Sequence, residues 1–313
     1  MGRNAVPVSP ENLPDPDDVT EAGGIEPLDV DSDVTEDISE TFEDTEFDIE
    51  EATGGRYTYV RDIRRGGMGR IILARDCELG REVAVKVLRS HHTDNPSVTA
   101  RFLREARITA CLLHPGVVPV YDLGMDAEGD HFFIMQCVEG QTLAELLQKA
   151  TVEGRPDPDQ LPHLLTILQH VCETVGYAHH SGIIHRDLKP SNIMVGAFGE
   201  VLVLDWGLAK RLDDPVEPEE RRVREEGCEE PLQDNDTTAG RVSGTPRYMS
   251  PEQAAGSFQH IGPPTDVFSL GIILHEILTG RKPFDGDTVK DVLAAVRQGK
   301  RRPLSRVLRE TGN

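Results

Sequence analysis

The hydrophobic pattern after the first fifty or so residues is typical of strands. From Tyr57 onward, short β-branched or aromatic runs are separated by Gly, Asp and Pro. These runs are RIILARD (70–76), EVAVKVL (82–88), VVPVYDLG (117–124) and HFFIMQCV (131–138). Between the second and third runs, apolar residues recur at helical spacing after Pro96, where a helix would begin. The pattern therefore predicts a small antiparallel sheet with one helix.

Farther along the chain the pattern becomes helical. The segments LPHLLTILQHVCETVGYAHHSG (161–182) and TDVFSLGIILHEILTG (265–280) predict two buried helices, the second closed by Gly280. Residues 211–240 interrupt this part with eleven acidic residues and four arginines, which predicts a loop. We expect an α+β fold with an N-lobe at about 57–138, a C-lobe at about 139–313, and any shared cleft between them.

The negative charge is concentrated at the N-terminus. The chain has a net charge of −22 and a hydrophobic fraction of 37%. Residues 1–53 contain eighteen Asp and Glu and one basic residue, Arg3. This composition predicts a disordered acidic tail, either a solvating leader or an arm that docks on a basic partner. We expect no nucleic-acid partner.

Nothing in the sequence predicts export or membrane insertion. No basic segment followed by an apolar core opens the chain, and no apolar run approaches the ~18 residues of a membrane span. The five cysteines are scattered without a C-x-x-C pair, so neither a disulfide framework nor a zinc site is expected. A reducing cytoplasm fits this pattern.

The stretch IRRGGMGRIILA (63–74) holds three glycines within four residues, namely Gly66, Gly67 and Gly69. Glycine lets the backbone approach a phosphate closely, because no Cβ intervenes. Arg64 stands where a G-x-G-x-x-G loop would have its first glycine. Taken alone, the stretch fits a nucleotide cradle with one changed position or a tight hairpin.

A set of longer motifs decides between these two interpretations. In chain order they are VAVK ending at Lys86, LREA with Glu105, HRDLKPSN (185–192), DWG (205–207) and GTPRYMSPE (244–252). With these motifs the chain resembles the eukaryotic-like (Hanks-type) serine/threonine protein kinases, especially the bacterial branch with its GGMG loop. The resemblance covers about residues 57–299 and implies a bilobal kinase domain within 54–313 that uses ATP and Mg²⁺, with Mn²⁺ as a possible substitute.

The resemblance implies catalytic roles for the charged residues. Lys86 would neutralise the α- and β-phosphates, and Glu105 would hold it by an ion pair. Asp187 would accept the proton of the substrate hydroxyl, and Lys189 would balance charge on the γ-phosphate. Asp205 and Asn192 would hold the metal ions.

The resemblance also implies an ATP site between the lobes. The Gln136 carbonyl and Val138 backbone would bind adenine beside a gatekeeper at Met135. The ring would lie between four apolar side chains, and the phosphates under the glycine-rich loop. These residues are Ile63, Ile71, Ala84 and Met194 for the ring, and Arg64, Gly66, Gly67, Met68 and Gly69 for the loop.

Protein substrates carrying Ser or Thr are implied by Lys189 and by Thr245, which resembles the residue that contacts the catalytic Asp in Ser/Thr enzymes. Thr237 and Thr238 precede Thr245 by eight and seven residues, where relatives carry activating phosphothreonines. Arg186 would receive that phosphate.

The chain departs from the family pattern at Trp206 and at its C-terminal end. Trp206 replaces the usual Phe and is expected to pack against His185, with its N–H satisfied. Glu252 is expected to lack its usual arginine partner, because the chain stops at Asn313 where two more C-lobe helices are expected. These departures keep open a pseudokinase or truncated binding module, and the peptide-docking motif at 244–252 argues against a small-molecule phosphotransferase.

Overall fold

The computed structural model describes residues 47–65, 69–88, 95–152, 155–214 and 245–302. All of them lie within one compact unit, residues 44–313. No helix in these ranges is long and apolar enough to cross a membrane.

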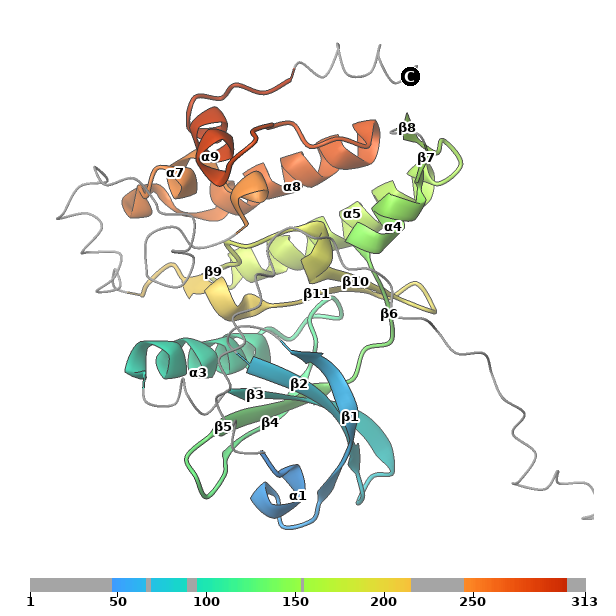
Figure 1. The fold of residues 1–313 in the computed structure, drawn as a ribbon, viewed down its shortest axis with the longest axis vertical. Coiled ribbons are helices and arrows are strands. Elements are labelled where there is room, and N and C mark those ends of the chain that lie inside the picture. The colour runs from blue at the N-terminus through green and yellow to red at the C-terminus, as the bar shows by residue number, and fades with distance from the viewer. Residues whose placement is uncertain (1–46, 66–68, 89–94, 153–154, 215–244, 303–313) are drawn as a thin grey trace, which may run out of the picture. The chain divides into compact units, whose positions relative to one another are not determined.

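The N-lobe is built on a five-stranded antiparallel sheet (Figure 1). Its strands are β1 (Tyr57–Arg65), β2 (Gly69–Asp76), β3 (Arg81–Leu88), β4 (Val120–Met125) and β5 (His131–Gln136). The order across the sheet is β1-β2-β3-β5-β4. The central strand β3 is buried over most of its length, and Lys86 is a half-buried exception within it. The predicted strands are thus confirmed.

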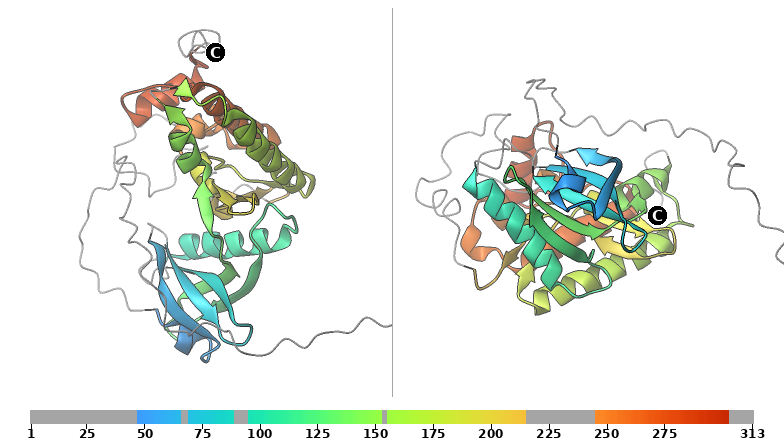
Figure 2. Two further views of the ribbon diagram at one scale, coloured as in Figure 1. Left: turned by 90° about the vertical axis from the view of Figure 1, so that its right-hand side faces the viewer. Right: turned by 90° about the horizontal axis from the view of Figure 1, so that it is seen from below.

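Helix α3 (Pro96–Cys111) is the predicted helix of the N-lobe, and it begins at the expected residue. The Asn95 side chain caps it by accepting the Ser97 N–H, and Pro96 occupies the first turn, where its missing N–H costs nothing. Phe102 packs against Phe133 of β5, with ring centroids 5.2 Å apart. Figures 1 and 2 both show α3 between the N-lobe sheet and the C-lobe.

The boundary expected for the acidic tail is wrong at its C-terminal end. Residues of the expected tail form helix α1 (Ile49–Ala52), in which the Ile49 side chain is only 1% exposed. Phe47 lies against Phe132 of β5, with ring centroids 5.4 Å apart. These two apolar residues pack on the sheet although the sequence around them is acidic, because burying an aromatic or Ile side chain is favourable by about 1.5–3 kcal/mol.

The C-lobe is mainly helical, as expected. Its helices are α4 (Leu143–Lys149), α5 (Leu161–His180), α7 (Pro251–Ala254), α8 (Pro263–Thr279) and α9 (Val289–Arg297). Its strands are β6 (Gly140–Thr142), β7 (Thr151–Val152), β8 (Arg155–Pro156), β9 (Ile183–Ile184), β10 (Ile193–Gly196), β11 (Val201–Val203) and β12 (Lys210–Arg211). Short 3₁₀ turns lie at Pro190–Asn192, Trp206–Leu208, Pro246–Tyr248 and Phe258–His260. Helices α5 and α8 pack on each other, and their buried faces contribute to the largest apolar cluster of the described residues, together with other helices and strands of the C-lobe.

The C-terminal part of the lobe corrects one expectation. Gly280 ends α8 with φ +65°, as predicted, which is a conformation that glycine adopts at little cost. Glu252, however, is not a buried carboxylate without a partner. It is half-buried, and its Oε1 accepts a hydrogen bond of 2.7 Å from the Thr265 hydroxyl on the first turn of α8.

Candidate active site

An ion pair joins strand β3 to helix α3. Lys86 Nζ lies 2.5 Å from Glu105 Oε1, and both side chains are largely buried. Burial alone would lower the pKa of Lys86, but Glu105 and then Asp205 raise it above its ordinary value, so the ammonium stays charged. Sequence reasoning expected this pairing, and the register of β3 turns Lys86 towards the helix.

Asp205 follows β11 in a left-handed conformation, with φ +59°. Burial alone would raise its pKa, but Lys86 and then His185 and Lys189 lower it below the ordinary value. Gly207 makes room for this arrangement, because a Cβ there would stand 3.0 Å from Glu105 Oε2 and 3.1 Å from Asp205 Oδ1. The carboxylate is therefore ionised and lies close to the Lys86–Glu105 pair.

A second cluster surrounds Asp187, whose side chain is buried. Lys189 Nζ donates to Asp187 Oδ2 and to the Thr245 hydroxyl, at 2.9 Å each. The Thr245 N–H donates to Asp187 Oδ1 at 3.0 Å, so both carboxylate oxygens are held. Asn192 Nδ2 donates to the Asp187 carbonyl at 3.0 Å. The geometry thus joins the catalytic-loop residues to Thr245, which comes from a segment 58 residues away.

Asn192 and Asp205 lie on chain segments that are hydrogen-bonded to each other. The Leu204 N–H donates to the Asn192 carbonyl at 2.8 Å. The side-chain nitrogen of Asn192 donates hydrogen bonds to Asp187, which leaves the side-chain oxygen for another contact. An ionised carboxylate and an amide oxygen suit a hard cation such as Mg²⁺. The described residues contain no cluster of three or more His, Cys, Asp or Glu that could hold a metal ion.

Asp266 of α8 was missed by sequence reasoning, yet it holds the backbone of His185 and Arg186, directly before Asp187. Its side chain is fully buried. It accepts the N–H of His185 and the N–H of Arg186 at 2.8 Å each, and it lies 2.7 Å from His179 Nε2. These bonds hold Arg186 at φ +69°, a strained conformation for a residue with a Cβ. The one signal in the sequence that could have revealed Asp266 is a single carboxylate at the start of a strongly apolar helix.

Trp206 packs against His185, as expected. It is 2% exposed, and its ring centroid lies 4.6 Å from that of His185. Its indole N–H donates to the Val203 carbonyl at 3.1 Å, which satisfies the buried donor.

The residues expected around adenine lie on four strands of the N-lobe, on the segment after β5, and on β10. Ile71 faces Lys86 across β2 and β3, and Ala84 pairs with Met135 across β3 and β5. The remaining members are Ile63 on β1, Gln136 at the end of β5, Val138 just beyond it, and Met194 on β10.

The glycine-rich stretch is described only at its two ends. Arg64 is exposed on β1 and pairs with Ile71. Gly69 begins β2, where a Cβ would stand 2.6 Å from the Val87 carbonyl, so the sheet itself requires glycine at this position. Gly66, Gly67 and Met68 lie outside the described residues.

The residues proposed for regulation are only partly described. Arg186 donates from Nε to the Leu208 carbonyl at 2.5 Å, and its own carbonyl accepts from Gln253 Nε2 at 2.7 Å. Thr237 and Thr238 lie outside the described residues.

Comparison with known proteins identifies the family. Residues 57–308 match the family described as protein kinase domain. The chain is 38% identical over 242 residues to the serine/threonine-protein kinase PknD of Protochlamydia amoebophila, covering 75% of this chain and 24% of that protein. It is 40% identical over 239 residues to PknD of Chlamydia muridarum (73% of this chain, 25% of that protein).

A third relative, PknD of Chlamydia pneumoniae, is 40% identical over 234 residues, covering 73% of this chain and 24% of that protein. The matched region thus spans about a quarter of each relative's length. The fold is the bilobal α+β kinase fold, and the chain belongs to the protein kinase family, whose members use ATP and a divalent metal.

Proposed function

We propose that this chain is an active serine/threonine protein kinase that transfers the γ-phosphoryl group of ATP to Ser or Thr hydroxyls of proteins. The observation that carries the proposal is the cluster of Asp187, Lys189 and Thr245. Lys189 Nζ donates to the Asp187 carboxylate and to the Thr245 hydroxyl, and the Thr245 N–H donates to Asp187, all within 3.0 Å. A chain that only bound partners would have no need for this arrangement of an acid, a cation and a hydroxyl.

Each charged group has a task in this transfer. Lys86, charged and fixed by Glu105, binds the α- and β-phosphates. Asp187 orients the substrate hydroxyl and accepts its proton, while Lys189 offsets the charge that develops on the transferred group. Because Thr245 fixes both Lys189 and the Asp187 carboxylate, it positions the base relative to the phosphoryl group.

Asp205 and Asn192 would hold Mg²⁺, or Mn²⁺ in its place. The metal would supply charge neutralisation for the nucleotide phosphates. The lowered pKa of Asp205 supports this assignment, since the carboxylate is ready to bind a cation at neutral pH.

For ATP we propose the site implied by the family. The adenine would bind at Gln136 and Val138 with Met135 as gatekeeper, between Ile63, Ile71, Ala84 and Met194. The phosphates would lie beneath the stretch from Arg64 to Gly69. The arrangement is supported by the pairing of Ala84 with Met135 and of Ile71 with Lys86, which puts apolar and cationic side chains on adjacent strands.

Transfer from γ-labelled ATP to a generic protein substrate tests the proposed activity. We expect label on phosphoserine and phosphothreonine and none on phosphotyrosine. Lys86→Met should lower the rate by about 100-fold or more, because a preorganised cation is lost. Lys290→Met, which changes an exposed lysine on α9, is the matched control and should keep the activity. Equal activity of Lys86→Met and the control would reject the proposal.

We further propose that the kinase phosphorylates its own Thr237 or Thr238 and that Arg186 binds the phosphate. The support is the position of Arg186, next to the catalytic Asp187 and tied to Leu208 of the DWG region. Mass spectrometry of active protein should find phosphate on one of the two threonines. Full activity of the Thr237→Ala/Thr238→Ala variant would argue against this step.

We propose that the chain acts in the cytoplasm, where ATP and protein substrates are available. The supporting observation is that the cysteines in the described ranges are free thiols, as is usual in a reducing compartment; they are Cys77, Cys111, Cys137 and Cys172. A basic partner for the acidic N-terminal region remains part of the proposal, supported by its charge.

A further inference from the structure

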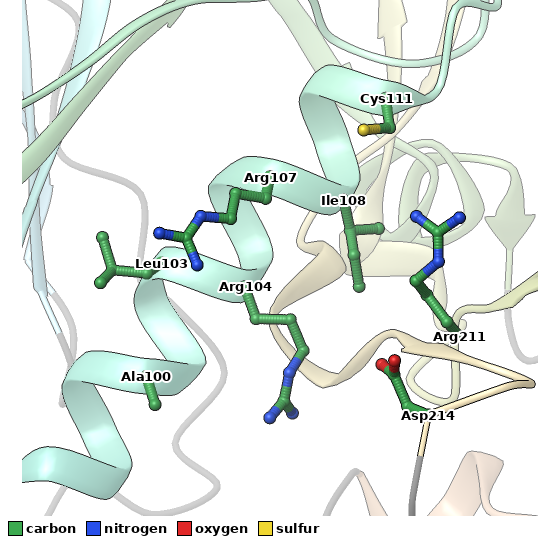
Figure 3. A pocket seen from close by; sticks show the side chains of 8 residues that line it. All are labelled: Ala100, Leu103, Arg104, Arg107, Ile108, Cys111, Arg211 and Asp214. Atoms are coloured by element: carbon green, nitrogen blue, oxygen red, sulfur yellow. The ribbon is translucent and has the colours of Figure 1, made fainter.

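A cavity of about 460 Å³ lies on the side of α3 that faces away from the N-lobe sheet (Figure 3). One wall is a stripe along α3 from Ala100 to Cys111, and the other is the segment that includes and follows β12. The lining residues are Ala100, Leu103, Arg104, Arg107, Ile108, Cys111, Arg211 and Asp214. Phe102, Glu105 and Ala106, which pack on β5 or pair with Lys86, lie on the opposite face of the same helix.

The rim of this α3 cavity is basic. Three arginines line it against a single acidic residue, Asp214. Arg107 and Arg211 are exposed, and within the described ranges neither guanidinium forms an ion pair. This local positive charge contrasts with the net negative charge of the chain, most of which lies in residues 1–53. The cavity therefore favours an acidic ligand.

The α3 cavity also has an apolar lining. Leu103 is half-buried and Ile108 is buried, and they lie five residues apart on the helix, with Arg104 and Arg107 between them (Figure 3). A volume of this size falls in the range of about 300–1,000 Å³ that is usual for ligand sites. Apolar side chains separated by guanidinium groups fit a segment in which apolar residues alternate with carboxylates, because arginine binds carboxylates in a planar, bidentate manner.

We propose that the α3 cavity is a docking site for a partner protein's acidic segment that carries one or two apolar anchor residues. The stripe from Ala100 to Cys111 extends for about 16 Å at 1.5 Å per helical residue, which matches about five residues of extended peptide. One apolar anchor contacts Leu103 and a second contacts Ile108, while the carboxylates pair with Arg107, which lies between these two side chains, and with Arg211. Since α3 also carries Glu105, the docked segment contacts the helix that holds Lys86.

The test is fluorescence anisotropy of the full chain with the labelled peptide DELDELDE. A control peptide isolates the contribution of the anchors: DESDESDE keeps the acids without them. We expect DELDELDE to bind at least tenfold more tightly than this control, and its affinity to fall with added salt. The assay requires no phosphate transfer, so its result is independent of the proposed kinase activity.

A charge-reversal pair then locates the binding. Arg107→Glu/Arg211→Glu should weaken DELDELDE binding by about tenfold or more, since two charge-assisted contacts are lost. Arg75→Glu/Arg301→Glu makes the same change in net charge at two exposed arginines outside the cavity, and should change the affinity by less than about twofold. Both pairs are exposed, so a melting curve should show that the fold is kept.

Three results would overturn the proposal. The first is equal binding of DELDELDE and DESDESDE to the unmodified chain. The second is equal loss of affinity in the two double variants, which would show that only net charge matters. The third is binding of a single-stranded oligonucleotide at least as tight as that of the peptide.

Discussion

Trp206 links the segment that carries Asp205 to the strand that precedes it. It directly follows Asp205, and its indole N–H donates to the Val203 carbonyl at 3.1 Å. The phenylalanine that usually stands at this position in the family cannot donate such a bond. A buried N–H···O bond of this kind contributes about 0.5–1.5 kcal/mol, and the unpaired carbonyl left by its loss adds to the cost. Trp206 therefore restricts the motion of the segment that carries Asp205.

We predict that Trp206→Phe lowers the free energy of unfolding by about 1–2 kcal/mol, from the lost hydrogen bond and the smaller ring. Scanning calorimetry should show the melting temperature reduced by about 2–8 °C. Tyr59→Phe, which removes a polar group from an exposed ring on β1, is the control and should leave the melting temperature unchanged. An unchanged transition in Trp206→Phe would show that the indole bond adds nothing.

At the scale of elements, helix α8 determines the conformation of the catalytic loop. Asp266 in its first turn accepts two backbone N–H groups of the loop and contacts His179 of α5, while its side chain has no exposure to solvent. The position also favours an anion, because the N-terminal end of a helix carries partial positive charge. One carboxylate thus joins α5, α8 and the loop that begins with His185.

We predict that Asp266→Asn destabilises the fold by about 3 kcal/mol, because an amide group must replace a buried charge that accepts several hydrogen bonds. Urea denaturation should give a lower midpoint, and phosphate transfer should fall as well, since the backbone of His185 and Arg186, which precedes Asp187, loses its support. Asp287→Asn, at an exposed position before α9, should have the same urea midpoint and the same phosphate transfer as the unmodified chain. Equal midpoints for the two variants would contradict this role of Asp266.

At the scale of the whole molecule, the two lobes are connected around the site. Arg101 of α3 donates from Nε to the Gly207 carbonyl at 3.3 Å, and the Val203 N–H donates to the Gly116 carbonyl at 2.8 Å. Ile108 and Leu112 at the end of α3 belong to the apolar cluster of the C-lobe. A ligand that contacts both lobes should therefore stabilise the entire folded unit.

We predict that ATP with Mg²⁺ at about 100 times its dissociation constant stabilises the fold by about 2.7 kcal/mol. The melting temperature should rise by roughly 5–11 °C, and removal of the metal with EDTA should abolish most of the rise. Asp205→Asn should lose the metal-dependent part, whereas Asp213→Asn, an exposed position nearby in sequence, should keep it. A rise that is identical with and without metal would contradict the assignment of Asp205.

Local patterns in the sequence were enough to predict most of the fold. The strand around Lys86 and the helix around Glu105 follow from residue spacing and from Pro96, and both were predicted with nearly correct ends. The errors concern partners that are distant in the sequence or masked by charged neighbours. Asp266 contacts His179 across 87 residues, and no local pattern reveals such a bond.

The same limitation explains two further errors. The apolar packing of Phe47 and Ile49 was obscured by the surrounding acidic residues, which made the segment look like part of the tail. The bond from Thr265 to Glu252 joins two helices whose contact depends on the fold of the C-lobe. The α3 cavity was also unforeseen, because its two walls are separated by about a hundred residues of sequence.

The central claim is that Asp187 carries out the chemistry while other residues bind the nucleotide, and one pair of measurements on Asp187→Asn tests it. The affinity for ATP with Mg²⁺ is measured by fluorescence titration, and phosphate transfer to protein by label from γ-labelled ATP. The account predicts an affinity within about threefold of the unmodified chain and a kcat lowered by about 100-fold or more, since a positioned base is lost. Transfer close to that of the unmodified chain would contradict the account.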